Sequence, residues 1–143
     1  MHCHIVFSTK NRDALITENI ATRLYEYIGG TCRGNGDALI AAGGMPDHIH
    51  LIVSLGKETS ATKAVRTIKS NSSRWVHETF DNLRGFAWQN GYGAFAISYS
   101  NLDDVKRYID NQAEHHRVRT FKEEFIALLK RHNLPYDERY LWG

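Results

Sequence analysis

The stretch GGMPDHIHLIVSL, residues 43–55, joins a cluster of turn-forming residues to an apolar run that contains two histidines. Glycine, proline and aspartate gather in residues 43–47, a composition typical of a turn. The run from His48 to Leu55 predicts a strand, and residues 37–42, DALIAA, predict another strand before the turn. Two strands joined by so short a connection indicate an antiparallel hairpin.

Periodicity and capping residues define the remaining elements. Strands are also predicted over residues 2–8 and 86–99, the second interrupted by glycines that suggest a bend or bulge. Helices are predicted from a Thr17 cap to Gly29-Gly30, over residues 59–80, from 102 to about 116, and from Thr120 to His132. This order predicts an α+β fold, a ferredoxin-like antiparallel sheet with helices on one face, followed by C-terminal helices.

Length and composition indicate one soluble domain over residues 1–143. Apolar residues make up 42% and charged residues 24%, and no apolar run approaches the roughly 20 residues of a membrane span. Cys3 and Cys32 lack the spacing of a zinc site or a disulfide framework, and no signal peptide is visible, so we expect a cytoplasmic protein. A net charge of +2 excludes nucleic-acid binding through bulk charge and leaves only local basic patches.

His48 and His50 alternate with Ile49 along the predicted strand. Side chains two residues apart in a strand share a face, about 7 Å apart along the backbone. Both imidazoles therefore point the same way, while Ile49 anchors the strand. Two imidazoles so placed can bind one divalent cation, because histidine is the commonest metal ligand. The pattern is short, and two solvated histidines on an exposed sheet face would also produce it.

The segment DDVKRYIDNQAEHH, residues 103–116, supplies candidate partners for a metal site. Tyr108 and Gln112 lie four residues apart, on one face of the predicted helix. Further polar residues near that stripe are Asp104, His115 and His116. The amide oxygen of Gln112 suits Mg²⁺ or Mn²⁺ better than zinc. Each residue also has a structural interpretation, a tyrosine ring packed on the sheet and a polar surface group.

Four separated segments together resemble the IS200/IS605-type Y1 transposases of the HUH endonuclease superfamily, to which REP-associated tyrosine transposases are related. In chain order they are MPDHIHLIV at 45–53, FAWQNGYGAFAIS at 86–98, YIDNQAEHH at 108–116 and YDERYLW at 136–142. The first strand, HIVFSTKNR at 4–12, is also similar. The resemblance covers nearly the whole chain in the expected order, so it is far more specific than the two histidines alone.

The resemblance implies an enzyme that cleaves and rejoins single-stranded DNA at hairpin-bearing element ends and so mobilises an insertion sequence. His48 and His50 match its metal-binding histidines, and Gln112 matches the third ligand of Mg²⁺ or Mn²⁺. Tyr108 matches the nucleophile, whose attack on phosphorus leaves a 5′-phosphotyrosine and a free 3′-hydroxyl. A homodimer is also implied, with the tyrosine helix of one subunit serving the histidines of the other.

A basic face on the predicted helix over residues 59–80 offers contacts to DNA phosphates, each of which would add salt-dependent affinity. Its members are Lys63, Arg66, Lys69 and Arg74, with Lys10 and Arg12 as weaker candidates elsewhere. A run of charges on a long helix is also the ordinary composition of a solvated face.

Two other functions stay open at this point. A ferredoxin-like module can bind single-stranded nucleic acid on its sheet without catalysis, and Tyr108 then has no chemical role. A metal-dependent phosphodiesterase would use the same histidines with an activated water and would never become attached to DNA.

Overall fold

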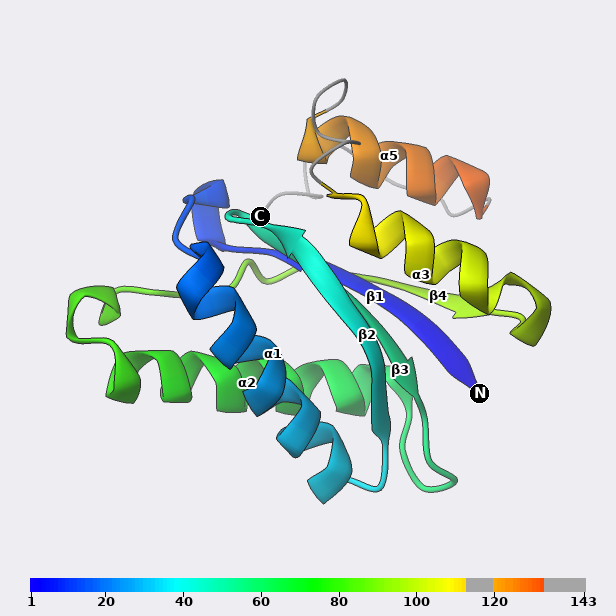
Figure 1. Ribbon diagram of the computed structural model, residues 1–143, viewed down its shortest axis with the longest axis horizontal. Coiled ribbons are helices and arrows are strands. Elements are labelled where there is room, and N and C mark those ends of the chain that lie inside the picture. Colours follow the sequence, from blue (N-terminus) through cyan, green and yellow to red (C-terminus); the bar gives the residue numbers. More distant parts are fainter. Residues whose placement is uncertain (113–119, 133–143) are drawn as a thin grey trace.

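The centre of the computed structural model, which describes residues 1–112 and 120–132, is a four-stranded antiparallel sheet (Figure 1). Its strands are β1 (His2–Ser8), β2 (Ala38–Met45), β3 (His48–Ser54) and β4 (Gly93–Ile97). They lie in the order β2-β3-β1-β4, so β1 and β3 are central and pair along their whole length. The order of strands and helices confirms the predicted ferredoxin-like α+β fold. That one domain spans residues 1–143 stays a prediction.

Helices cover both faces of the sheet (Figure 1). The first pair, α1 (Glu18–Gly34) and α2 (Ala61–Thr79), packs on one face, while α3 (Leu102–Asp110) and α5 (Phe121–Arg131) lie on the other. Short 3-10 turns between these elements are η1 (Lys10–Arg12), η2 (Asp81–Leu83) and η3 (Tyr99–Asn101). In the described part of the chain, no helix is long and apolar enough to span a membrane.

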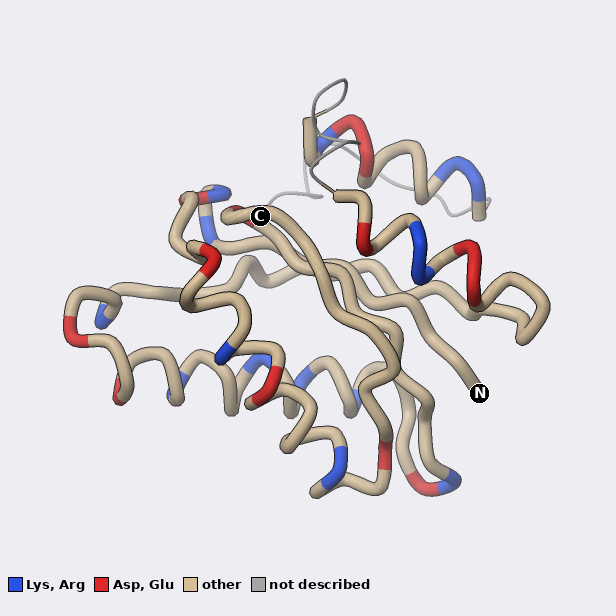
Figure 2. Tube along the Cα trace, viewed as in Figure 1, with Lys and Arg blue, Asp and Glu red and all other residues tan. Residues whose placement is uncertain are grey.

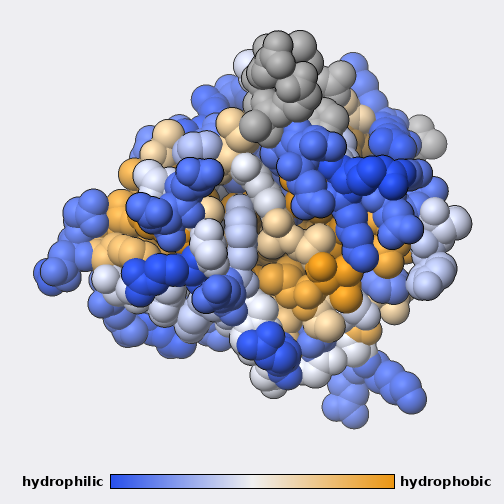
Figure 3. Space-filling model, in the orientation of Figure 1, coloured by the Kyte–Doolittle hydropathy of each residue, from blue (hydrophilic) through white to orange (hydrophobic). Residues whose placement is uncertain are grey.

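Alternation of side chains along the central strands gives the sheet two different faces. Ile49 and Leu51 are fully buried in the larger core, among side chains of α1 and α2. On the other face, Val6 packs with phenylalanines of α5, and His48 and His50 belong to this side. Figure 3 shows hydrophilic side chains over most of its view, with apolar ones concentrated near the centre, where the strands run. As predicted, Ile49 anchors the strand in the core while its neighbours His48 and His50 point to the opposite face.

The hairpin between β2 and β3 is tighter than predicted. Strand β2 continues through Gly43 and Gly44 to Met45, so the turn contains only Pro46 and Asp47. The prediction of a turn over residues 43–47 was therefore wrong. These glycines serve close approach: a Cβ atom on Gly43 would lie 2.8 Å from the carbonyl oxygen of Ile109 in α3. Gly43 thereby lets α3 lie directly against β2.

The first helix is longer than its sequence suggested. The predicted end at Gly29-Gly30 was wrong, because α1 continues to Gly34 and Gly36 follows it with a φ of 81°. Glycine inside a helix costs about 1 kcal/mol relative to alanine. Here Ile28 and Cys32 are buried on either side of the glycine pair, so packing on the sheet outweighs that cost.

The aromatic segment over residues 86–99 is a strand only in part. Regular pairing is confined to β4, and Trp88 forms an isolated bridge with Thr9. The indole of Trp88 is buried and donates a hydrogen bond to Ser72 Oγ over 2.9 Å, so the segment before β4 docks on α2. The predicted Thr120 cap is confirmed, and it forms a capping box with Glu123. Residues 113–116 of the predicted tyrosine helix and the tail over 136–142 lie outside the described residues.

Replacing Gly43 by alanine tests the contact between β2 and α3. We expect Gly43→Ala to lower the free energy of unfolding by about 1–3 kcal/mol, because the added methyl group overpacks against the backbone of Ile109. Gly34→Ala is the matched control, since a Cβ there meets nothing within 4 Å, and it should be neutral or slightly stabilising. Urea denaturation measures both. Equal stability of Gly43→Ala and the wild type would contradict the close approach.

Candidate active site

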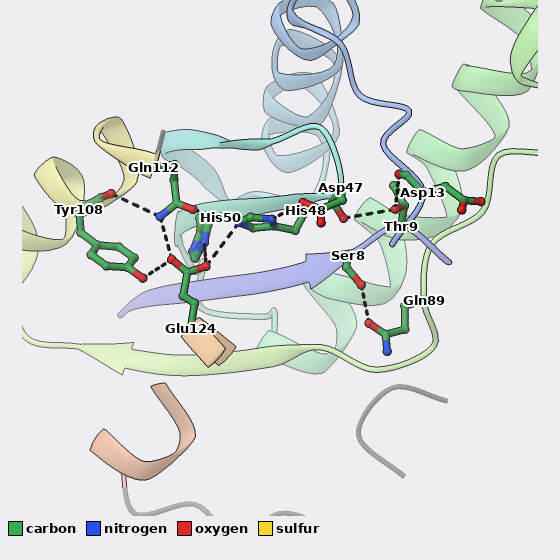
Figure 4. A network of polar contacts seen from close by, with 10 residues as sticks. All are labelled: Ser8, Thr9, Asp13, Asp47, His48, His50, Gln89, Tyr108, Gln112 and Glu124. Atoms are coloured by element: carbon green, nitrogen blue, oxygen red, sulfur yellow. Dashed lines mark hydrogen bonds and ion pairs between the residues drawn. The ribbon is translucent and has the colours of Figure 1, made fainter. Parts of the chain in front are cut away.

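His48 and His50 stand at the centre of a buried polar cluster (Figure 4). Both imidazoles are completely buried, and their ring centroids are 5.2 Å apart. They project from β3 toward α3 and α5, so the interpretation as solvated histidines on an exposed sheet face was wrong. Buried imidazoles require polar partners, and those partners come from β1, the turn before β3, the segment that contains Gln112, and α5.

The first partner is Glu124 on α5, whose carboxylate lies between the two histidines (Figure 4). Its Oε1 atom is 3.1 Å from His50 Nε2 and 3.4 Å from His48 Nε2. The Thr120 capping box fixes the start of α5 and so directs Glu124 toward the sheet. Only 1% of Glu124 is exposed, so its carboxylate is removed from water and the two histidines replace the lost hydrogen bonds to solvent.

The second and third partners are Gln112 and Tyr108. Gln112 Oε1 lies 3.0 Å from His48 Nε2, while its amide nitrogen donates to Glu124 Oε2 over 3.2 Å. The Tyr108 hydroxyl donates a hydrogen bond to the same Oε2 atom. The helical spacing of four predicted that these two side chains share a direction, and the structure brings both to the histidines.

Each histidine also has a partner at its far nitrogen. His48 Nδ1 lies 2.8 Å from Asp47 Oδ1, and His50 Nδ1 lies 2.9 Å from His4 Nε2 on β1. Both Nε2 atoms therefore point into the cluster while both Nδ1 atoms are held from outside. Histidines that bind metal ions in proteins have this arrangement, because the outer hydrogen bond fixes ring orientation and tautomer.

Burial and charge shift the proton affinities of the cluster. Burial by itself would raise the pKa of Glu124, but hydrogen bonds with His48 and His50 outweigh it and hold that pKa well below its usual range. Burial would likewise lower the pKa of His48, yet hydrogen bonds with Asp47 and Glu124 raise it to about 9. For His4, burial and the neighbouring His50 lower the pKa to about 3. Without metal, the cluster thus pairs an ionised carboxylate with a protonated His48.

The donor atoms fit a divalent cation. Neighbouring ligands on an octahedral ion with bonds of about 2.1 Å are separated by about 3.0 Å. The pairs His48–Gln112, His50–Glu124 and His48–Glu124 are separated by 3.0, 3.1 and 3.4 Å between their facing atoms. Two imidazoles, one amide oxygen and one carboxylate are all donors that divalent cations accept in proteins.

Three members of the cluster were missed by sequence reasoning: Glu124, His4 and Asp47. Glu124 lies 12 residues after Gln112, which is no recognisable ligand spacing, and the docking of α5 brings it to the site. His4 carried a signal, because the HCH stretch places two histidines on one strand face just as HIH does. Asp47 directly precedes His48 but was assigned only to the turn.

The predicted DNA-binding residues of α2 lie on the far side of the sheet from this cluster. Lys63, Arg66 and Arg74 are exposed there, along the basic side of the helix visible in Figure 2. Arg66 also lines a groove of about 470 Å³, together with the half-exposed Tyr92. Their contact with DNA stays a prediction.

Lys69 differs from the other basic residues of α2. Its ammonium donates hydrogen bonds to the backbone carbonyls of Gln89, Asn90 and Gly91, over 2.5, 3.2 and 3.1 Å. It also lies 5.2 Å from the ring centroid of Phe7. These contacts give Lys69 a structural role, in which it fastens the segment before β4 to α2.

Lys10 and Arg12 lie at the end of the sheet that carries the histidines. They belong to η1, and the residues on either side of it are hydrogen-bonded to the β2–β3 turn. Thr9 donates its amide to the Asp47 carbonyl, and Ile16 to the Pro46 carbonyl, each over 2.9 Å. The contact of Lys10 and Arg12 with DNA likewise stays a prediction.

Lys69→Met should lower the free energy of unfolding by about 1–3 kcal/mol, because it leaves backbone carbonyls without their charged donor. Lys63→Met, on the same helix but exposed, should change that free energy by less than about 0.5 kcal/mol. Chemical denaturation monitored by circular dichroism compares the two. If both variants unfold alike, Lys69 does not fasten the segment, and its role as a phosphate contact regains support.

Comparisons with known proteins identify relatives in sequence and in fold. A family model described as IS200-like transposase matches residues 1–112. The ISDra2 transposase TnpA of Deinococcus radiodurans is 24% identical over 114 residues, which cover 76% of this chain and 81% of that protein. A crystal structure from D. radiodurans R1, described as a transposase, matches with a TM-score of 0.65 and 25% identity, over 78% of this chain and 90% of that one. A REP-associated tyrosine transposase bound to a REP hairpin shares the fold, with a TM-score of 0.63 and 19% identity, over 80% of this chain and 67% of that one.

Proposed function

The chain belongs to the IS200-like transposase family, and from this premise we propose that it cleaves and rejoins single-stranded DNA by metal-assisted tyrosine transesterification. One observation carries the proposal: Tyr108 donates its hydroxyl hydrogen to the carboxylate that lies between His48 and His50. A nucleophile and a set of metal ligands, distant in the sequence, thereby meet in one buried cluster. A sheet that only bound nucleic acid would have no need of this convergence.

His48, His50, Gln112 and Glu124 are the residues proposed to hold Mg²⁺ or Mn²⁺. When bound, the ion polarises a phosphoryl oxygen of the DNA and stabilises the charge that develops there, which lowers the barrier by several kcal/mol. Asp47 keeps the His48 ring oriented from outside. The apolar layer formed by Phe121 and Phe125 limits the access of water to this side of the sheet.

Tyr108 is the proposed nucleophile. Its phenolic oxygen attacks phosphorus, so that a bond forms between that oxygen and phosphorus while the bond from phosphorus to the 3′-oxygen breaks. Glu124 Oε2 accepts the Tyr108 hydrogen bond and is placed to receive the phenolic proton, which ends on the departing 3′-oxygen. The products are a 5′-phosphotyrosine and a free 3′-hydroxyl. Because the covalent bond keeps the energy of the phosphodiester, another 3′-hydroxyl can reverse the step and join new ends.

A cavity of about 260 Å³ opens beside the phenol and offers room for a nucleotide. It is lined by residues of β1, β4, α3 and α5, among them His4, Phe95, Tyr108 and the exposed Arg131. Asp104, on the same side of α3, also lines it and forms an ion pair with Arg107. The cavity joins the nucleophile to solvent, so a flexible single strand could reach phosphorus there.

The structure of a relative suggests which binding partner this chain has. The REP-associated tyrosine transposase was solved with a REP hairpin, and we propose that this chain likewise takes hairpin-bearing single-stranded DNA. A homodimer in which the tyrosine helix serves the partner's histidines stays a prediction. Within the single chain, Tyr108 already contacts the carboxylate between its own His48 and His50.

Tyr108→Phe should abolish the covalent intermediate, because it removes only the attacking oxygen. Single-stranded oligonucleotides spanning the element ends, labelled on the 3′ side, are incubated with protein and Mn²⁺ and resolved on an SDS gel. The wild type should give an SDS-resistant adduct that EDTA prevents, and Tyr108→Phe should give none. Tyr99→Phe is the control, since Tyr99 is 83% exposed and lies outside the cluster, and it should behave as the wild type.

The other outcomes distinguish the competing functions. Cleavage by both wild type and Tyr108→Phe without any adduct would establish water as the nucleophile and contradict the proposed mechanism. DNA binding without metal-dependent cleavage in the wild type would support a protein that only binds nucleic acid.

Glu124→Gln tests the carboxylate as a metal ligand. We expect the dissociation constant for Mn²⁺ to rise about tenfold or more, because a neutral amide replaces a charged oxygen ligand. Electron paramagnetic resonance of free Mn²⁺ measures this constant without any DNA. Glu123→Gln is the matched control, since glutamine preserves the capping box at that position, and its Mn²⁺ affinity should equal that of the wild type. Unchanged affinity in Glu124→Gln would remove Glu124 from the ligand set.

A further inference from the structure

His4 is a third histidine at the cluster, and the proposed mechanism leaves it without a role. It lies on β1, only 4% exposed, with its Nε2 atom 2.9 Å from His50 Nδ1. The two rings are nearly parallel, at 29°, with centroids 5.1 Å apart. Phe95 and Tyr108 surround the other sides of the His4 ring at centroid distances of 6.0 and 6.4 Å.

Packing alone does not account for an imidazole in this place. A position enclosed by two aromatic rings would accept phenylalanine, whereas a buried polar ring is costly unless its nitrogens are hydrogen-bonded. The hydrogen-bonding geometry of His4 is directed at one atom, His50 Nδ1. His2 offers a comparison on the same face of β1: it is half-exposed and packs against Tyr99, away from the cluster.

Metal binding at His50 would determine which ring donates and which accepts in the hydrogen bond between His4 and His50. When His50 Nε2 binds a cation, that nitrogen carries no proton, so the ring proton must be on Nδ1. His4 Nε2 then accepts the hydrogen bond, with its own proton on Nδ1. Asp47 makes the corresponding contact at His48, so each metal-facing histidine is held from behind by one side chain.

We propose that His4 is a positioning residue that holds His50 with Nε2 directed at the metal ion and its proton on Nδ1. This inference rests on the proposed metal centre. An imidazole suits the position because it is neutral, and Glu124 already supplies a buried negative charge on the other side of His50. An imidazole nitrogen can also donate, so the contact persists in the metal-free protein when His50 Nε2 carries the proton and faces Glu124.

Mn²⁺ binding by four full-length proteins tests this role: wild type, His4→Phe, His4→Gln and His2→Phe. Electron paramagnetic resonance gives each dissociation constant without DNA. His4→Phe keeps the ring packing but loses the hydrogen bond, so its affinity should fall about 10–100-fold. His4→Gln still offers a donor and an acceptor and should stay within about threefold of the wild type. His2→Phe should match the wild type.

The outcomes separate the failure of this inference from that of the metal centre. A wild type that binds no Mn²⁺ overturns the metal centre, and the role of His4 with it. A wild type that binds Mn²⁺ no better than a folded His4→Phe protein overturns the role of His4 alone. An equal loss in His4→Phe and His4→Gln also overturns it, because the hydrogen bond is then not what matters.

A second measurement tests the role of His4 even if His4→Phe does not fold. In wild-type protein labelled with nitrogen-15 and saturated with Mg²⁺, we expect His50 to carry its proton on Nδ1. A scalar coupling should cross the hydrogen bond from that nitrogen to His4 Nε2. A His50 Nδ1 without a proton, or the absence of that coupling, would overturn the proposal.

Discussion

The site depends on one buried carboxylate. Glu124 is 1% exposed, and removing an ionised carboxylate from water costs several kcal/mol unless partners replace the solvent. Two imidazole nitrogens face its Oε1 atom, while a phenol and an amide donate to its Oε2 atom. These partners come from β3, from Tyr108 in α3 and from Gln112 just beyond α3, so the need to satisfy one charge fixes the positions of β3, α3 and α5 relative to each other. The carboxylate thus provides a polar link between α5 and both histidines.

The sheet can hold such a cluster because one of its faces packs the apolar core and the other carries polar side chains. The odd-numbered residues of β3 fill the core beneath α1 and α2, which supplies most of the apolar burial. The even-numbered histidines are thereby free to form a polar centre on the other face, covered by α3 and α5. Gly43 completes this division, because a side chain there would collide with Ile109 and hold α3 away from β2. A glycine in the strand thus sets how close the tyrosine helix can approach.

The sequence predicted those parts of the molecule that follow from local periodicity. The spacing of two in HIH placed both histidines on one face, and the spacing of four directed Tyr108 and Gln112 to the same cluster, although α3 ends at Asp110 and Gln112 lies just beyond it. It failed where contacts distant in the chain decide the outcome. Gly43 and Gly44 resembled a turn because glycine lacks a side chain, yet a Cβ on Gly43 would meet a helix more than 60 residues later in the chain, and one on Gly44 would meet the backbone of β3. Packing against the sheet also carried α1 past Gly29-Gly30.

The same limit explains the missed site residues. Glu124 is separated from His50 by 74 positions, and no local pattern links it to the histidines, whereas the exposed Glu123 next to it closes the capping box with Thr120. Lys69 shared the spacing of its basic neighbours, but only it meets the carbonyls of the segment before β4. Charge type in a sequence therefore indicates what a residue can do, while burial decides which partner it finds.

The two carboxylate oxygens of Glu124 face two different parts of the site. Oε1 faces the nitrogens proposed to bind the cation, and Oε2 faces the phenol proposed to attack phosphorus. Gln112 contacts both sides of this arrangement, since its oxygen faces His48 and its nitrogen donates to Oε2. The plane of the carboxylate is therefore fixed by groups that belong to the metal site and by the nucleophile together. A displacement of either one is transmitted through a single rigid group to the other, so the phenolic oxygen and the proposed metal ligands keep a common geometry.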